Sequence, residues 1–440
     1  MTDTYQKTAT VTKAPVFSMA QVAPWVIAVI FLMVLPIAFG SNSAITIMNQ
    51  MMITIVFALS YNMLLGQGGM LSFGHAVYMG VGGFFCMHLM NIVEANELPI
   101  PLPVLPIFGG LFGLGLATIV GSFSTRKAGT VFAMISLGIG ELIAACSVII
   151  VAFFGGEEGM PGDRTYFLPF FGTEFLRQIE VYYLIAFWTV LSALLMYLFS
   201  RTPVGRMANA VRDNPERAEF LGYSARWVRF FSFCGAGFFA GIAGGLFAIN
   251  YEILTETNLS TTQSGIILLI TFLGGVGFFF GPILGAIAFT LLQSVLSLQS
   301  EIWQLYLGAL FLATVMFFPG GLAGVLMMHV PAARMGRLGW LVGPYLRTIL
   351  PALIGIAGLA ALMELLFHVR HSATGETDMT LFWVTFDSHS ILPWIVAIVA
   401  TVGGIWLARQ GAPNLRETWH RANTPGAAKV NSMLSPKSSS

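Results

Sequence analysis

Long apolar runs dominate this chain, and short polar or Gly-rich segments separate them. Crossing the roughly 30 Å of hydrocarbon in a bilayer takes about 20 apolar residues in a helix. About twelve membrane-spanning helices are therefore expected, near residues 25–40, 44–65, 70–91, 103–122, 129–154, 181–200, 229–250, 264–280, 281–298, 303–327, 348–368 and 391–408. The pair over 264–298 is divided only by Gly-Val-Gly-Phe-Phe-Phe-Gly-Pro, so two spans and a re-entrant hairpin are both compatible with it.

The composition supports a membrane protein. Of the 440 residues, 56% are hydrophobic and 9% are charged, whereas soluble domains carry roughly 25% charged residues. The net charge of +1 gives no reason to expect a nucleic-acid partner. We therefore predict an all-α, polytopic bundle of membrane helices, with about ten helices in a core and two more near the C-terminus.

The basic residues predict how the chain is oriented. If the N-terminus is cytoplasmic and the twelve spans alternate, 18 of the 21 Lys and Arg residues fall on the cytoplasmic side, as the positive-inside rule requires. The remaining three are Arg164, Arg177 and Arg370. Both termini are then expected in the cytoplasm. We predict a cytoplasmic N-terminal segment over 1–24 and a transmembrane domain over 25–327. A C-terminal extension with two spans is expected over 328–408, and a disordered cytoplasmic tail over 409–440.

The basic loop 201–228 holds a short sequence with helix-boundary signals. Asp213 or Asn214 can cap a helix, Pro215 suits its first position, and Gly222 can end it in a left-handed conformation. The acidic side chains of Glu216 and Glu219 suit its N-terminal half. A two-turn helix on the cytoplasmic face is expected. It is either a surface turn between two spans or an element that transmits force when another protein grips it.

Polar side chains inside the predicted spans are candidates for a translocation path. Glu141 lies near the middle of 129–154, where a carboxylate is costly unless it is neutral, paired or facing water. It either lines a path or packs as a structural carboxylate, with His75 as one possible partner. Ser72 and His75 follow a Gly-rich turn and are the other candidates, although hydrogen bonding between helices would also explain them. Glu364, close to His368, is expected to reach the interface.

Several kinds of chemistry are not indicated. The sequence has no Gly-x-x-x-x-Gly-Lys-Ser/Thr loop for binding ATP, so an ATP-driven process would need a separate ATPase subunit. No cluster has zinc-ligand spacing, and Cys86, Cys146 and Cys234 read as small buried hydrophobes. No enzyme activity, metal or bound cofactor is therefore expected for this chain.

Five motifs occur in one order within residues 40–327, and together they resemble the branched-chain amino acid ABC importer permeases, specifically the LivM-type inner-membrane subunit. They are GQGGMLSFGHAVYMGVGG (66–83), GTVFAMISLGIGEL (129–142), the segment 204–222, LGGVGFFFGPILGA (273–286) and PGGLAG (319–324). The outer motif GGEEGMPG (155–162) departs from the family pattern, because Glu157 and Glu158 stand where small polar and Asn residues are usual. The two C-terminal spans are not required by the family pattern.

The resemblance implies the fold and function of an ABC importer permease in the bacterial inner membrane. The partners it implies are a second homologous permease, two cytoplasmic ATP-binding subunits that hold the ATP, and an outer substrate-binding protein. It implies that Glu157, Glu158 and Gly159 lie in the loop where the binding protein docks. The residues expected to couple to the ATPase are Arg212, Asp213, Glu216, Ala218, Glu219, Leu221 and Gly222.

The resemblance leaves the solute open among branched-chain amino acids, urea or short amides, and small organic acids. An alternative function is a twelve-span secondary transporter driven by an ion gradient. Its familiar pattern places a basic loop between the second and third spans, whereas this chain has the uncharged segment 66–69 there. A membrane-embedded enzyme would show clustered His, Asp or Cys residues near one interface, and none is evident.

Overall fold

The computed structural model describes residues 19–170, 172–371, 378–381 and 384–424, with side chains described from residue 22. It confirms the predicted class, an all-α polytopic membrane protein. The described chain is helical apart from turns and two small two-stranded sheets. The described residues form two compact units. One consists of the residues up to Ser294 together with Ala313–Leu322, and the other of Val295–Leu312 together with the residues from Ala323 onward.

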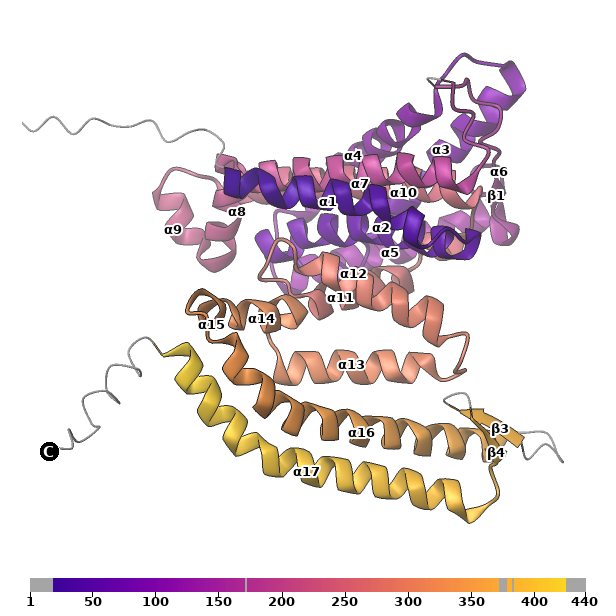
Figure 1. Ribbon diagram of the computed structural model, residues 1–440. Coiled ribbons are helices and arrows are strands. Elements are labelled where there is room, and N and C mark those ends of the chain that lie inside the picture. Colours follow the sequence, from indigo (N-terminus) through magenta and orange to yellow (C-terminus); the bar gives the residue numbers. More distant parts are fainter. Residues whose placement is uncertain (1–18, 171, 372–377, 382–383, 425–440) are drawn as a thin grey trace, which may run out of the picture. The chain divides into compact units, whose positions relative to one another are not determined.

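Figure 1 labels the helices and strands in chain order. The helices up to residue 291 are α1 (Met19–Ala38), α2 (Asn42–Asn62), α3 (Ala76–Asn96), α4 (Leu105–Ser124), α5 (Thr130–Ile149), α6 (Val151–Phe154), α7 (Gln178–Arg201), α8 (Pro203–Asp213), α9 (Pro215–Phe220), α10 (Ala225–Tyr251), α11 (Thr261–Gly274) and α12 (Gly281–Leu291). The later helices are α13 (Trp303–Phe317), α14 (Gly321–Met328), α15 (Val330–Arg334), α16 (Leu338–His371) and α17 (Ile391–Asn423). The strands β1 (Met160–Pro161) and β2 (Ile253–Leu254) pair antiparallel, as do β3 (Asp378–Leu381) and β4 (Val384–Asp387).

The number of spans differs from the expected twelve. Eight helices of the described chain are long and apolar enough to cross a bilayer, or nine if α13 and the helical segment after it form one span with a 50° bend. The other three predicted spans correspond to shorter apolar helices within α1, α11 and the segment that starts with α12. At 1.5 Å per residue the 14-residue α11 is about 21 Å long, which is less than the hydrocarbon thickness. The count of twelve is therefore not confirmed.

Helix α10 forms the centre of the first unit, where it packs against α2, α3 and α4. Small residues make this possible, because they allow helix backbones to approach closely in a membrane. A side-chain carbon added at Gly241 would lie 2.2 Å from the carbonyl oxygen of Gly109 on α4, and one at Gly244 would lie 1.9 Å from that of Met79 on α3. The glycines on α10 thus hold three helices at backbone contact.

Two membrane helices, α16 and α17, pack together along the second unit and are joined through the β3–β4 hairpin (Figure 1). Near one end of the pair, Leu365 and Ala397 pack against Met379 of the hairpin. Near the other end, Ala422 packs with Ala332 and Leu341. This contact explains why α17 continues to Asn423, so the disorder predicted from residue 409 is not found over 409–423.

The predicted division of the chain remains a prediction. The predicted boundary at 327/328 lies inside α14, and residues 425–440 of the predicted tail lie outside the described residues. Most of the predicted N-terminal segment, residues 1–18, also lies outside them.

Candidate functional site

Two short helices, α8 and α9, connect the long helices α7 and α10 and lie at one end of the first unit's bundle (Figure 1). The sequence sets their boundaries. Thr202 caps α8 by accepting a hydrogen bond from the Gly205 amide, and Asn214 caps α9 by accepting one from the Arg217 amide at 2.9 Å. A cap of this kind stabilises a helix by about 1 kcal/mol. Gly222, with φ +85°, turns the chain after α9. The predicted helix is confirmed, with Asn214 as its cap.

A small apolar cluster fixes this pair of helices to the bundle. Ala218 of α9 is buried against α8 and the first turns of α10, in the cluster Ala208, Val211, Ala218, Ala225 and Val228. The other predicted coupling residues are exposed. Phe220 and Leu221, 90% and 67% exposed, form an apolar tip at the end of α9. Large apolar side chains exposed in this way are typical of a surface that a partner covers.

Arg212 connects α8 to the turn between α2 and α3. Its guanidinium donates hydrogen bonds to the carbonyl oxygen of Gly66 and, at 3.0 Å, to the carboxylate of Asp213. Gly69, with φ +64°, lies directly beneath the Arg212 side chain, and a side-chain carbon there would be 2.6 Å from its Cγ. A displacement of α8 and α9 would thus be passed directly to the polypeptide that joins two membrane helices.

The first turn of α11 brings together the elements that carry the predicted path residues. Thr261 donates a hydrogen bond to the carboxylate of Glu141 on α5. Ser264, one turn later, accepts a hydrogen bond from the amide of Ala76 at 2.9 Å, directly after His75. Glu141 itself is exposed on α5, and only 28% of an apolar 18-residue segment of that helix is buried. The face of α5 that carries this carboxylate is therefore uncovered in the single chain.

His75 and Ser72 are buried inside the packed bundle. The Nε2 atom of His75 lies 3.0 Å from the hydroxyl oxygen of Ser60, and the ring is stacked on Phe57. The carbonyl oxygen of Ser72 accepts a hydrogen bond from the hydroxyl of Tyr61 at 2.9 Å. Both residues are 1% exposed. The structure thus pairs His75 with Ser60, and it pairs Glu141 with Thr261 rather than with His75.

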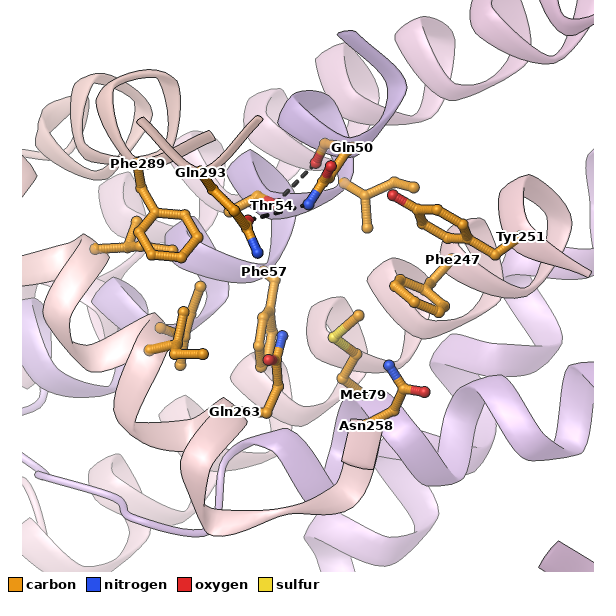
Figure 2. Close-up of a pocket in the computed structure, with 14 residues that line it drawn as sticks. Gln50, Thr54, Phe57, Met79, Phe247, Tyr251, Asn258, Gln263, Phe289 and Gln293 are labelled. Atoms are coloured by element: carbon orange, nitrogen blue, oxygen red, sulfur yellow. Dashed lines mark hydrogen bonds between the residues drawn. The ribbon is translucent and has the colours of Figure 1, made fainter. Parts of the chain in front are cut away.

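A cavity of about 230 Å³ opens on the other side of the same turn of α11 (Figure 2). Its polar lining consists of carboxamides and hydroxyls: Gln50, Thr54, Tyr251, Asn258, Gln263 and Gln293. The Gln50 Nε2 atom donates to Gln293 Oε1 at 3.2 Å, while Asn258 and Gln263 lie across the hollow in Figure 2. Phe57, Phe247 and Phe289 contribute apolar walls, and the lining contains no charged side chain. The cavity can therefore hold a small solute through uncharged hydrogen-bonding groups and apolar contacts.

The predicted docking loop lies at the end of the bundle away from α8 and α9 (Figure 1). Glu157 and Glu158 are exposed on a single 3-10 turn. Gly159, with φ +78°, is buried. A larger residue does not fit there, because a side-chain carbon would lie 2.3 Å from the carbonyl oxygen of Leu254. Pairing of β1 with β2 fastens this loop to the end of α10. The two carboxylates are thus presented outward from a rigid turn.

Several polar residues around this site were not predicted. Arg164 is 6% exposed, and its guanidinium donates hydrogen bonds to the carbonyl oxygens of Phe175 and Ile249. A guanidinium nitrogen also lies 3.7 Å from a carboxylate oxygen of Glu252, so Arg164 holds the outer loop in place. The cavity carboxamides were also missed. Their signal in the sequence is a Gln or Asn inside an apolar helix, as at Gln50 and Gln293. Because Asn and Gln also bond helices together without lining a cavity, that signal cannot select a site.

Comparison with known proteins gives the family. The fold and these sites define a multi-pass helical membrane protein with a hydrogen-bonding cavity. A family model described as "Branched-chain amino acid transport system / permease component" matches residues 43–319. The chain belongs to this family and is a transport permease. No solved structure matches the chain with significance.

Two kinds of curated relatives agree with this family. The chain is 26% identical over 303 residues to the high-affinity branched-chain amino acid transport system permease protein LivM of Escherichia coli (strain K12), across 64% of this chain and 70% of LivM. It is 32% identical over 199 residues to the autoinducer 2 import system permease protein LsrC of Yersinia pestis (strain Pestoides F), across 43% of this chain and 55% of LsrC. The two relatives import different solutes by name.

Proposed function

We propose that this chain is the membrane-spanning permease subunit of an ATP-binding-cassette importer for a branched-chain amino acid or a related small solute. The observation that carries the proposal is the α8–α9 pair. It is fixed to α10 by an apolar cluster, connected to the α2–α3 turn by Arg212, and ends in the exposed Phe220 and Leu221. This arrangement suits an element that receives force from a partner. The family match supports the transport role.

The partner that supplies the force is proposed to be a cytoplasmic ATPase. This chain has no phosphate-binding loop of the Walker type, so ATP is held and hydrolysed on separate subunits. Two such subunits and a second permease would complete the importer. The α8–α9 end is then cytoplasmic, as the basic residues of 201–228 indicate, and the N- and C-termini share that side of the bacterial inner membrane.

The solute path is proposed to run along the exposed face of α5, next to the first turn of α11. A carboxylate such as Glu141 is costly against lipid, so this face needs water or a partner helix beside it. The carboxamide cavity behind the same turn supplies uncharged hydrogen bonds. His75 and Ser72 act by holding the segment before α3 in place, because both are buried away from that cavity.

Solute delivery is proposed to occur at the opposite end of the bundle. A substrate-binding protein would dock on the outer loop, with Glu157 and Glu158 exposed to it and Gly159 shaping the turn. These carboxylates favour a basic rim on that protein. ATP-driven movement of α8 and α9 would then open the path alternately to the two sides.

The test is a mild-detergent pull-down of the tagged chain from its own host, with mass spectrometry of the proteins that co-purify. Beside the wild type we would run Phe220→Ala with Leu221→Asp, which removes the apolar tip but no residue of the buried cluster. The matched control is Phe317→Ala, another highly exposed Phe, on α13. Gel filtration of each variant would check that the chain remains folded.

The expected result is recovery of a Walker-motif ATPase and a second permease with the wild type and the control, and loss of the ATPase with the tip variant. A chain that purifies alone and moves solute in liposomes under an ion gradient would contradict the proposal. It would favour the secondary transporter instead.

A further inference from the structure

The second unit contains a buried carboxylate that the family match does not account for. Glu364 lies on α16, beyond the last residue of the match at 319, and is 8% exposed. It therefore does not extend to the interface as the sequence suggested. One carboxylate oxygen, Oε1, accepts hydrogen bonds from the hydroxyl groups of Ser300 and, at 2.7 Å, Tyr306. Two neutral hydroxyls orient this group without balancing its charge.

No cationic partner balances Glu364 among the described residues. The three ion pairs there join Arg164 to Glu252, Arg212 to Asp213 and Arg421 to Glu417. Leaving an ionised carboxylate buried without a counter-charge is costly, and a cation bound beside it offsets part of that cost. The chemistry of the group therefore points to a positively charged ligand.

Two cavities in this unit meet at the Glu364 side chain. One has a volume of about 540 Å³, and its walls are mainly apolar, with Leu296, Leu298, Ile356 and Leu381 among them. The other has a volume of about 380 Å³ and a polar, acidic lining that includes Glu301 and Asp378. Both are also lined by Gln299, Ser300 and Thr380. The carboxylate thus has apolar space on one side and further negative charge on the other.

The remaining groups around the acidic cavity agree with a cation. His368 lines it one helical turn after Glu364, and its Nε2 atom is buried without a hydrogen-bond partner. His371 also lines it. No group of three or more His, Cys, Asp or Glu residues in the described chain could hold a metal ion. An organic cation fits this lining better than a metal ion does.

We propose that the second unit binds a hydrophobic ammonium ion, with the charged nitrogen at Glu364 and the apolar body in the larger cavity. Glu364 is the acidic residue that lines both cavities, and Ser300 and Tyr306 fix its orientation. The ammonium donates hydrogen bonds to the carboxylate, which are stronger than those between neutral groups. The site is independent of the solute path in the first unit and does not rest on the proposed transport function.

The experiment measures equilibrium binding of radiolabelled 2-phenylethylammonium to the full chain in nanodiscs of phosphatidylglycerol, a lipid without an ammonium group. Glu364→Gln keeps the size of the side chain and an oxygen acceptor for Ser300 and Tyr306, but it removes the charge. Glu417→Gln, at an exposed ion pair on α17, is the matched control. Unlabelled 2-phenylethanol, the neutral analogue, is the competitor, and thermal unfolding of each variant reports folding.

We expect saturable binding that 2-phenylethanol does not displace, unchanged in Glu417→Gln. In Glu364→Gln the affinity should fall about tenfold or more, because a hydrogen bond to a charged group is lost. Binding that is absent from the wild type, or equal in wild type and a folded Glu364→Gln variant, would overturn the proposal. Tyr306→Phe, which removes one of the two hydrogen bonds to Glu364, should show a smaller loss if Glu364→Gln fails to fold.

Repeating the measurement in phosphatidylethanolamine nanodiscs identifies the natural source of the ammonium group. Weaker binding of the probe there means that the lipid headgroup competes for the site. Equal binding means that the ligand is a free amine. Failure of the proposal would leave the permease function untouched, because neither uptake nor a partner protein enters the measurement.

Discussion

Helices α10 and α17 are both long and apolar, yet they are buried to very different extents. In an apolar 18-residue segment of α10, 83% is buried within the protein, whereas in the corresponding segment of α17 the share is 11%. The less buried segment is the more apolar one, since its mean hydropathy is 2.2 in α17 and 1.7 in α10. Lipid tails are as apolar as a protein interior, so hydropathy does not separate a central helix from a peripheral one. The difference is the number of helices met at small residues. Gly241 and Gly244 of α10 approach the backbones of α4 and α3, whereas Gly404 of α17 approaches that of α16.

The largest expected effect tests that difference with one substitution at two places. Gly244→Ala on α10 should destabilise the protein by about 3 kcal/mol, because the new methyl group would collide with the backbone of Met79 and of Gly83. Gly403→Ala on α17 is the matched control, since a side-chain carbon there meets nothing within 4 Å. Thermal unfolding in detergent would measure both. Equal losses of stability would refute the contrast.

A second prediction concerns the connection between α8 and the α2–α3 turn. Arg212→Ala should lower ATP-driven uptake about tenfold, which corresponds to about 1.4 kcal/mol, while the ATPase still co-purifies. The reason is that the substitution removes the hydrogen bonds of Arg212 to Gly66 and Asp213 but leaves the apolar tip of α9 intact. Arg206→Ala, an exposed Arg on the same helix, should keep wild-type uptake. An Arg212→Ala variant with normal uptake would exclude this route of coupling.

Glu141 gives a prediction of intermediate size about the exposed face of α5. Glu141→Leu should reduce uptake about tenfold, since the carboxylate and its bond to Thr261 are both lost. Glu141→Gln keeps an acceptor for Thr261 and should reduce uptake less. Neither variant should change thermal stability much, because the residue is exposed. Uptake that falls equally in both variants would mean that the charge, and not the hydrogen bond, is needed.

The smallest effect is expected from removing the α16–α17 pair. A chain that ends at Gly336 lacks α16 and α17 but keeps all of the residues that match the family model. Its uptake should stay within about twofold of wild type, or about 0.4 kcal/mol, since α16 and α17 belong to the other compact unit and independent units contribute additively. The comparison is between initial uptake rates at equal expression. A severe loss would show that the pair supports the permease core.

Much of the candidate site could be located from the sequence because its signals are local. The cap at Asn214, the proline after it and the left-handed Gly222 each depend on a few neighbouring residues, and they define α9 before any packing exists. Glu141 stood out because a carboxylate within an apolar run is rare. Its partner could not be found in this way, since Thr261 lies 120 residues later in the chain.

The sequence by itself determined the class of the protein, its long helices and the family motifs, because hydrophobic length and local capping need no tertiary contact. Only the tertiary structure decided which helices are central, which apolar runs fall short of a span, and where the polar side chains meet. It placed Gln50 and Gln263 around one cavity, and it buried Glu364 against Ser300 and Tyr306. The physical reason is that burial and hydrogen bonding depend on neighbours from distant parts of the chain, which only packing brings together.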